Sequence, residues 1–247
     1  MKLSIVGTGL ALLLSSAVAA PATGGRGNGP ELALLYDFYG VEGADVPDGS
    51  GHRLTGRLEA GTIVQGREKP AVRFAGEGSI TTGRTPQDLD FAARPLTVGA
   101  MCRPSAPDGV IVSMGDASEG FSLYLRGGVP HFAVRTGGVL HQVAAPEAVD
   151  LDAWVHLAGV VGAKGEISIL VNTWPAARVE GSLLARSPAE PLTVGADAGA
   201  FVGDYAAPLH WQGLLQDVRL YWGAVNREDH RDLLGEWAAR PGCGCRK

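Results

Sequence analysis

Short apolar runs recur along this chain between glycine-rich turns, starting near Leu32. In Phe121–Leu125 and Ile167–Val171 the apolar side chains occupy alternate positions, and Trp154–Ala158 alternates large apolar with smaller or polar residues. A period of two places one set of side chains on a buried face and the other set toward solvent. The pattern therefore predicts short antiparallel strands, each with one buried face.

The turns between these runs support the same interpretation. Gly127–Gly128, Gly137–Gly138 and Lys164–Gly165 each separate two neighbouring runs, and glycine supplies the positive φ that tight hairpins need. The expected strands are Ala33–Phe38, Ile63–Gln65, Ala71–Phe74, Ser79–Thr81, Leu96–Arg103, Val110–Met114, Phe121–Arg126, His131–Thr136, Leu140–Ala144, Trp154–Val161, Ile167–Val171, Arg178–Ser182, Leu192–Val194 and Gln212–Tyr221.

One segment near the C-terminal end has a helical pattern instead. Asn226 is a suitable N-cap, and Leu233, Leu234 and Trp237 fall on one side of the helix that would follow it, before Pro241. No long helical pattern interrupts the strands, which disfavours parallel βαβ folds. We therefore expect a single all-β antiparallel sandwich domain with a short C-terminal helix.

The N-terminal segment has the features of a secretory signal peptide. Lys2 precedes an apolar stretch at Leu3–Leu14, and Ala17–Ala19 has the small-x-small cleavage pattern. An uncleaved anchor is the alternative, but the apolar stretch is shorter than the ~20 residues that span a bilayer. We expect a signal peptide at residues 1–20, a flexible linker at 21–30, the domain at 31–239 and a cysteine-containing tail at 240–247. The expected location is periplasmic or extracellular.

Composition agrees with a strand-rich, exported protein. Glycine accounts for 36 of 247 residues, about twice its usual share, as expected for many tight turns. The formal net charge is −5 and becomes one unit more negative when Lys2 is removed with the signal. A mildly acidic chain is a poor partner for nucleic acid, which usually requires a basic patch.

Several motifs in order along the chain resemble one known family. They are Tyr36–Phe38, Asp48–Gly51 with Leu54–Thr55, Ala71–Gly76, Pro95–Val98, Trp154–Val160, Ile167–Asn172, Pro191–Gly195, Gln212–Tyr221 and Glu228–Leu234. Together they are similar to the laminin G-like jelly-roll domains of the concanavalin A-like lectin and glucanase superfamily, over about Leu32 to Trp237. The resemblance implies a two-sheet jelly roll.

Two positions depart from the family pattern. Thr173 follows Asn172 where the family has glycine, so we expect that a two-residue Asn-Gly turn cannot form and that this hairpin tip is different. Gln216 stands where the family often has aspartate.

The sequence lacks the catalytic patterns of the superfamily's enzymes. Its glycosidases carry an E-x-D-x-x-E strand, whereas Glu166–Ile169 offers a single carboxylate. No G-x-S-x-G elbow is present, and the six histidines have no metal-binding spacing. We therefore expect no catalytic activity. A glycosidase or polysaccharide lyase with a different active site is the alternative.

The resemblance also implies a structural calcium site. The matching positions are Asp48, the Gly51 region and Asp217, because oxygen-rich loops suit this hard cation. The alternative is that Asp48 closes an Asx-type turn and that Asp217 faces solvent.

Candidate ligand-binding residues are aromatic and polar. Aromatic rings suit the C–H faces of sugars. Trp174 is the main candidate, and the residues that accompany it are Asn172, Arg178, Tyr205, His210 and Trp211. The alternatives are that Trp174 packs on a neighbouring loop and that Trp211 belongs to the core, which is the reading we favour for Trp211.

The expected function is therefore an exported, non-catalytic module that binds carbohydrate or an extracellular protein surface. A structural or adhesive envelope protein, linked through Cys243 and Cys245, is the other alternative. Cys102 is expected to be a small buried residue within a strand.

Overall fold

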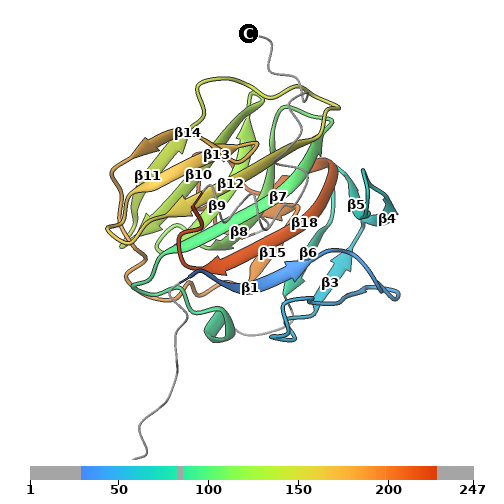
Figure 1. The fold of residues 1–247 in the computed structure, drawn as a ribbon, viewed down its shortest axis with the longest axis horizontal. Helices are drawn as coiled ribbons and strands as arrows, with labels where there is room; N and C mark the ends of the chain where they lie inside the picture. The colour runs from blue at the N-terminus through green and yellow to red at the C-terminus, as the bar shows by residue number, and fades with distance from the viewer. Residues whose placement is uncertain (1–28, 83–85, 198, 227–247) are drawn as a thin grey trace, which may run out of the picture.

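The computed structural model describes residues 29–82, 86–197 and 199–226, which form two large antiparallel sheets packed face to face (Figure 1). The strand order of the first sheet is β14 (Trp174–Val179), β13 (Ile167–Val171), β12 (Val155–Val161), β7 (Leu96–Pro104), β18 (Gln212–Trp222), β5 (Pro70–Ala75) and β4 (Thr62–Gln65). β1 (Glu31–Tyr36) also pairs with β18.

The second sheet packs on the other side of the core. Its strand order is β11 (Val139–Ala144), β10 (Val129–Thr136), β9 (Gly120–Arg126), β8 (Gly109–Gly115), β15 (Leu192–Val194), β6 (Ser79–Thr82), β3 (Gly56–Glu59) and β2 (Asp45–Val46). A separate pair joins β16 (Ala196–Asp197) to β17 (Leu209–His210), and a 3-10 helix, η1, covers Pro86–Leu89. No helix in the described ranges is long and apolar enough to cross a membrane.

Alternate residues of facing strands fill the core between the sheets. On β7, for example, Val98 and Cys102 point inward, and on β9 Phe121 and Leu123 do the same. Burial raises the pKa of the Cys102 thiol, so this cysteine is a small apolar residue, as expected. The antiparallel sandwich predicted from the period-two pattern is confirmed. The predicted signal peptide and C-terminal helix, and most of the predicted linker, lie outside the described residues.

β18 is the strand that joins the parts of the first sheet. Its first half pairs with β5 and its second half with β1, while its other edge pairs with β7 throughout (Figure 1). The register shifts between Gln216 and Arg219, where Asp217 has a φ of 50°. This bulge lies at the position where the sequence departs from the family pattern, and the fully buried Gln216 accepts a hydrogen bond from the Arg67 backbone N–H (3.1 Å).

The hairpin after β13 has a two-residue tip that contains no glycine. Asn172 and Thr173 form a two-residue turn with φ angles of 51° and 70°, and Val171 pairs with Trp174 directly across it. The Asn-Gly turn is absent, as expected, but the hairpin keeps a two-residue turn with threonine at its second position. The backbone of Asn172 donates to His156 O (2.8 Å) and its side chain accepts from His156 N (3.1 Å). These bonds to β12 hold the turn although threonine disfavours a positive φ.

Candidate ligand-binding face

The outer face of the second sheet is partly covered by the segment between β16 and β17. Because Phe121, Leu123 and Leu125 point into the core, Ser122, Tyr124 and Arg126 of β9 point outward. The turn at Gly127–Gly128 pairs Arg126 with Val129 and therefore places Tyr124 opposite His131 of β10. Residues 199–208 cross this outward face and contribute further side chains to it.

A buried carboxylate holds the crossing segment in place. Asp197 is 2% exposed and accepts hydrogen bonds from the Tyr205 hydroxyl (2.6 Å), the Ser113 hydroxyl (3.1 Å) and the Val202 backbone (3.3 Å). Ser122 Oγ lies 2.7 Å from the Tyr205 hydroxyl oxygen. Burial, reinforced by the charge of Asp197, raises the pKa of Tyr205. Tyr205 is therefore a neutral donor that anchors residues 202–205 to the strands below.

Aromatic rings form a stack beneath this segment. The ring of Tyr124 stacks on His131 with centroids 5.1 Å apart and meets Tyr205 edge-on at 4.6 Å. The Tyr124 hydroxyl donates to Gln142 Oε1 (2.6 Å) and accepts from Asp204 N (3.3 Å). Burial raises the pKa of Tyr124 to about 12, whereas burial and the Arg126 charge lower the pKa of His131. Both groups are thus neutral near pH 7.

Accessible side chains surround this stack. Phe201 is 43% exposed, and the Arg135 guanidinium lies 5.7 Å from its ring centroid. Arg135 also donates to Val202 O (2.6 Å) and Gly138 O (3.2 Å), and Arg126 forms an ion pair with Asp204. We call the accessible group the β9–β11 face, and its residues are Arg126, His131, Arg135, Gln142, Phe201 and Asp204.

The β9–β11 face carries the kinds of side chain that bind a ligand. Phe201 and His131 offer ring surfaces, while Gln142, Arg126 and Arg135 offer fixed polar groups around them. This is the combination that sugar rings bind through their C–H faces and hydroxyls.

The buried carboxylates of the described chain all accept hydrogen bonds. Glu119 is bonded to backbone N–H groups, Asp197 to hydroxyls and a backbone N–H, and Asp217 to the Lys69 ammonium. Such carboxylates act as structural acceptors.

The five predicted ligand residues lie in two separate parts of the fold. Tyr205 lies on the side of the second sheet that carries the β9–β11 face, and His210 of β17 contacts Gly78 O through Nδ1 (3.1 Å). Trp174, 59% exposed, and Arg178 lie on the edge strand β14 of the first sheet, and Asn172 precedes them in the turn. Arg178 forms an ion pair with Glu166 (2.9 Å). These residues therefore do not form one site, and their role in binding stays a prediction.

Trp211 is fully buried, so the expectation that it belongs to the core is confirmed. None of the six residues of the β9–β11 face was predicted as a ligand residue from the sequence. The two-residue turn at Gly127–Gly128 was the available signal, because it fixes Tyr124 opposite His131. Phe201 carries no such signal, since its position depends on the hydrogen bonds of Asp197.

The residues expected to bind calcium do not fit a cation. Asp48 accepts from the backbone N–H groups of Leu35 (3.0 Å), Ser50 (2.9 Å) and Leu54 (3.0 Å), and from the Ser50 hydroxyl (2.7 Å). Burial alone would raise the pKa of Asp48, but these hydrogen bonds outweigh it and hold the pKa of this carboxyl below its usual range. Its two oxygens thus use about four acceptor positions. Both oxygens of Asp217 bind Lys69 Nζ, at 3.1 and 3.0 Å.

We therefore expect the thermal stability of the protein to be independent of calcium. The melting temperature measured by circular dichroism should be the same in millimolar CaCl2 and in EDTA, because a cation would have to displace donors that already satisfy Asp48. A rise in melting temperature with calcium, lost in EDTA, would show that the ion binds and that these donors rearrange.

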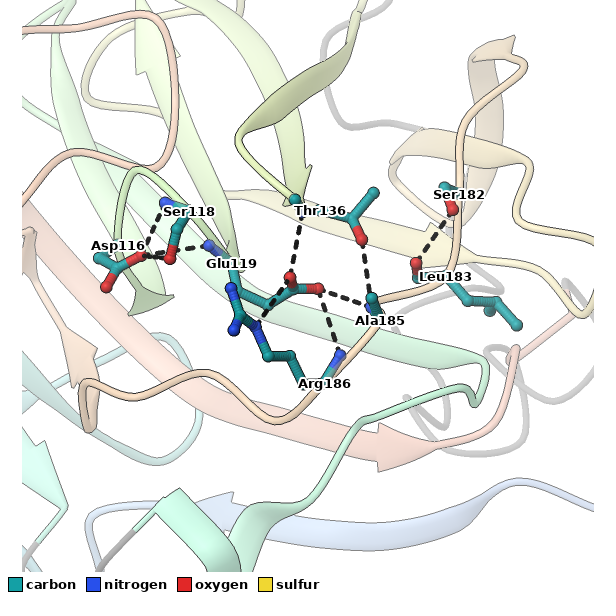
Figure 2. Close-up of polar contacts among 9 residues, drawn as sticks. Asp116, Ser118, Glu119, Thr136, Ser182, Leu183, Ala185 and Arg186 are labelled. Carbon is teal, nitrogen blue, oxygen red and sulfur yellow. Dashed lines mark hydrogen bonds and ion pairs between the residues drawn. The ribbon is translucent and has the colours of Figure 1, made fainter.

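A second buried carboxylate joins three segments at one end of the second sheet. Figure 2 shows Glu119 between Thr136, at the end of β10, and the Ala185–Arg186 segment. Glu119 accepts from Ala185 N (2.6 Å) and Gly137 N (3.1 Å), and Arg186 Nε lies 3.7 Å from its carboxylate. Because Gly137 begins the β10–β11 turn, Glu119 supports the strands that carry Arg135 and Gln142.

The fold is shared with solved binding domains. The binding domain of Paraclostridial Mosquitocidal Protein 1 superposes with a TM-score of 0.65 at 16% identity, over 84% of this chain and 52% of that one. Domain 4 of AbnA, a GH43 extracellular arabinanase from Geobacillus stearothermophilus solved with arabinotriose, gives 0.65 at 16% identity, over 84% of this chain and 100% of that one.

The botulinum neurotoxin serotype C1 binding domain gives a TM-score of 0.62 at 11% identity, over 84% of this chain and 52% of that one. The chain thus spans about half the length of the mosquitocidal protein and botulinum neurotoxin binding domains and the whole of the arabinanase domain. A comparison with curated protein sequences gives no match. The family described as the concanavalin A-like lectin/glucanases superfamily matches residues 74–229, more than half of the sequence. The chain belongs to this superfamily.

Proposed function

We propose that this chain is an exported, non-catalytic module that binds carbohydrate through the β9–β11 face. The observation that carries the proposal is the half-exposed ring of Phe201, held beside Arg135 by a segment that Asp197 anchors. A ring fixed in this way loses little conformational entropy when a sugar packs on it. The pattern of the N-terminal segment supports export.

Two further observations support this function. Domain 4 of the arabinanase, which has the same fold over its whole length, was solved with a bound oligosaccharide. The buried carboxylates Glu119, Asp197 and Asp217 already accept hydrogen bonds from protein donors, which favours binding over glycoside hydrolysis.

The test is a glycan array followed by titration of the best ligand. Phe201→Ala should weaken the dissociation constant by about tenfold, the equivalent of ~1.4 kcal/mol, because the ring surface is removed. The single variant Gln142→Ala should also weaken binding of the same ligand. Trp174→Ala is the matched control, since it removes a more exposed ring from the opposite sheet, and it should leave the affinity unchanged.

Loss of binding in Trp174→Ala but not in Phe201→Ala would place the ligand on β14 and reject the β9–β11 face. Failure of every glycan, together with retained binding to an extracellular protein, would reject carbohydrate as the ligand. Release of reducing ends or unsaturated products from a polysaccharide panel would show that the module is catalytic.

A further inference from the structure

The β9–β11 face carries two arginines, and a carboxylate neutralises only one of them. Arg126 forms an ion pair with Asp204, and this pair lies near His131, whose pKa both charges influence. Arg135 forms no ion pair with any carboxylate in the described part of the chain. It lies four residues beyond His131 on β10, about 13 Å along an extended strand. Arg135 is therefore a positive charge that stands apart from the Arg126–Asp204 pair.

Neutral groups hold the guanidinium of Arg135 in place. Its Nε donates to the carbonyl of Val202 (2.6 Å), and one terminal nitrogen donates to the carbonyl of Gly138 (3.2 Å). Neither acceptor is charged, so these bonds orient the group without cancelling its charge. A guanidinium has five N–H donors, and because two of them are used here, three remain for a ligand.

Glu119, which lies at the start of the strand next to Arg135, does not neutralise this charge. Gly120, the following residue, pairs with Arg135 between β9 and β10. The Glu119 carboxylate is nevertheless 3% exposed and forms its ion pair with Arg186. It also accepts from the backbone N–H of Gly137. The acceptor capacity of Glu119 is thus used by other donors.

The space beside Arg135 is open to a ligand. The β10–β11 turn, one residue further along the chain, consists of the exposed residues Gly137 and Gly138. A methyl group added to either glycine would meet no atom within 4 Å. A ligand can therefore reach the guanidinium from the side of this turn.

Ring, aliphatic and amide groups lie beside Arg135. The ring of Phe201 is 43% exposed, and its centroid lies 5.7 Å from the guanidinium carbon. Alternate residues of β10 point into the core, so Arg135 points outward together with its partner on β11, Leu140. Gln142 is the next outward residue on β11, about 7 Å further along the strand. Its Oε1 accepts from the Tyr124 hydroxyl (2.6 Å), which leaves its amide N–H groups for a ligand.

We infer that the β9–β11 face selects acidic sugars, with the carboxylate of a hexuronic acid unit bound to Arg135. This inference rests on the proposed function and adds the chemical class of the ligand. A planar guanidinium matches the two oxygens of a carboxylate with parallel N–H donors. Phe201 packs on the C–H side of the same sugar, and Gln142 donates to one of its hydroxyls.

The test compares each acidic ligand with a neutral form of the same molecule. Oligomers of galacturonate, glucuronate and mannuronate are titrated into the full chain by calorimetry, each beside its methyl ester. At least one acid should bind about tenfold more tightly than its ester, because the ester lacks the charge that Arg135 recognises. This preference should shrink in about 0.5 M NaCl, which screens an accessible charge.

Arginine variants separate recognition by Arg135 from the effect of overall charge. Arg135→Gln should abolish the preference for the acid, and Arg135→Lys should keep part of it, since lysine retains the charge but not the planar fork. The ratio of the acid's affinity to the ester's is the decisive quantity, because a displaced Phe201 weakens both ligands alike.

The control variant is Arg103→Gln, which removes the same charge from the first sheet. Arg103 lies on β7, is half-buried like Arg135, and donates through Nε to a backbone carbonyl, that of Asp152 (2.8 Å). Its replacement should leave the ratio of the two affinities at the wild-type value.

Other outcomes would overturn the inference or the function on which it rests. Esters that bind as tightly as the acids would reject a carboxylate ligand and leave carbohydrate binding by the face in place. A preference for the acid that survives in Arg135→Gln would assign the carboxylate to another cation. A sulfated neutral glycan that binds as tightly as the acids would show selection of anions in general. Failure of every acid, ester and neutral glycan would reject the proposed function itself.

Discussion

Replacing Gly159 by alanine is expected to lower the free energy of unfolding by about 3 kcal/mol, a drop in melting temperature of roughly 6–12 °C. Gly159 lies in β12, where the two sheets pack closely. A Cβ at this position would lie 2.2 Å from Cδ2 and 2.3 Å from Cγ of Phe132. Phe132 is fully buried in the core, so its ring cannot move aside without displacing other core side chains.

The control and the rescue test the same contact. Gly29→Ala should leave the melting temperature unchanged, because nothing lies within 4 Å of the added methyl group. Phe132→Leu combined with Gly159→Ala should recover part of the loss, since a smaller side chain makes room for the methyl group. If Gly159→Ala unfolds at the wild-type temperature by circular dichroism, the sheets do not pack this closely at β10 and β12.

The fold was readable from the sequence because its information is local. Each of the strands at Phe121 and Ile167 shows period-two alternation, and each glycine-rich turn marks a hairpin. The contact of Gly159 with Phe132 was not readable, because the two residues belong to different sheets and no local pattern joins them. The geometry of the Asn172–Thr173 turn was not readable for a related reason, since bonds to His156 of another strand outweigh the local preference of threonine.

The candidate site also contains some features that local sequence predicts and others that depend on long-range contacts. The position of Tyr124 opposite His131 follows from a two-residue hairpin and could have been deduced. The placement of Phe201 could not, because residues 199–208 have no repeating pattern and take their position from hydrogen bonds to Asp197 and Ser122. Trp174 was favoured as an aromatic residue at a hairpin, a signal that does not specify which sheet the hairpin belongs to.

Replacing Glu119 by alanine is expected to lower the free energy of unfolding by about 1–3 kcal/mol. Glu119 is 3% exposed, and its removal leaves the N–H groups of Gly137 and Ala185 without their carboxylate acceptor (Figure 2). A hydrogen bond to a charged group contributes ~1.5–3 kcal/mol, but Gly137 and Ala185 are exposed residues, so water replaces part of what each N–H group loses. Thr136 Oγ1 also accepts from Ala185 N (3.1 Å), which keeps the loss below the sum of two such costs. Urea unfolding measures the change.

Two measurements show whether Glu119 holds the neighbouring segments together locally or only stabilises the whole fold. They are the stability of a second Glu119 variant and hydrogen exchange at individual amides. Glu119→Gln should lose less stability than Glu119→Ala, because its amide retains one acceptor oxygen for either Gly137 or Ala185. Glu147→Ala, at an exposed loop position, should have no effect. Hydrogen exchange in Glu119→Ala should accelerate first at the amides of Gly137 and Ala185, since these groups lose their acceptor directly. Uniform acceleration across β10 and β12 instead would mean that Glu119 does not act as a clamp between these segments.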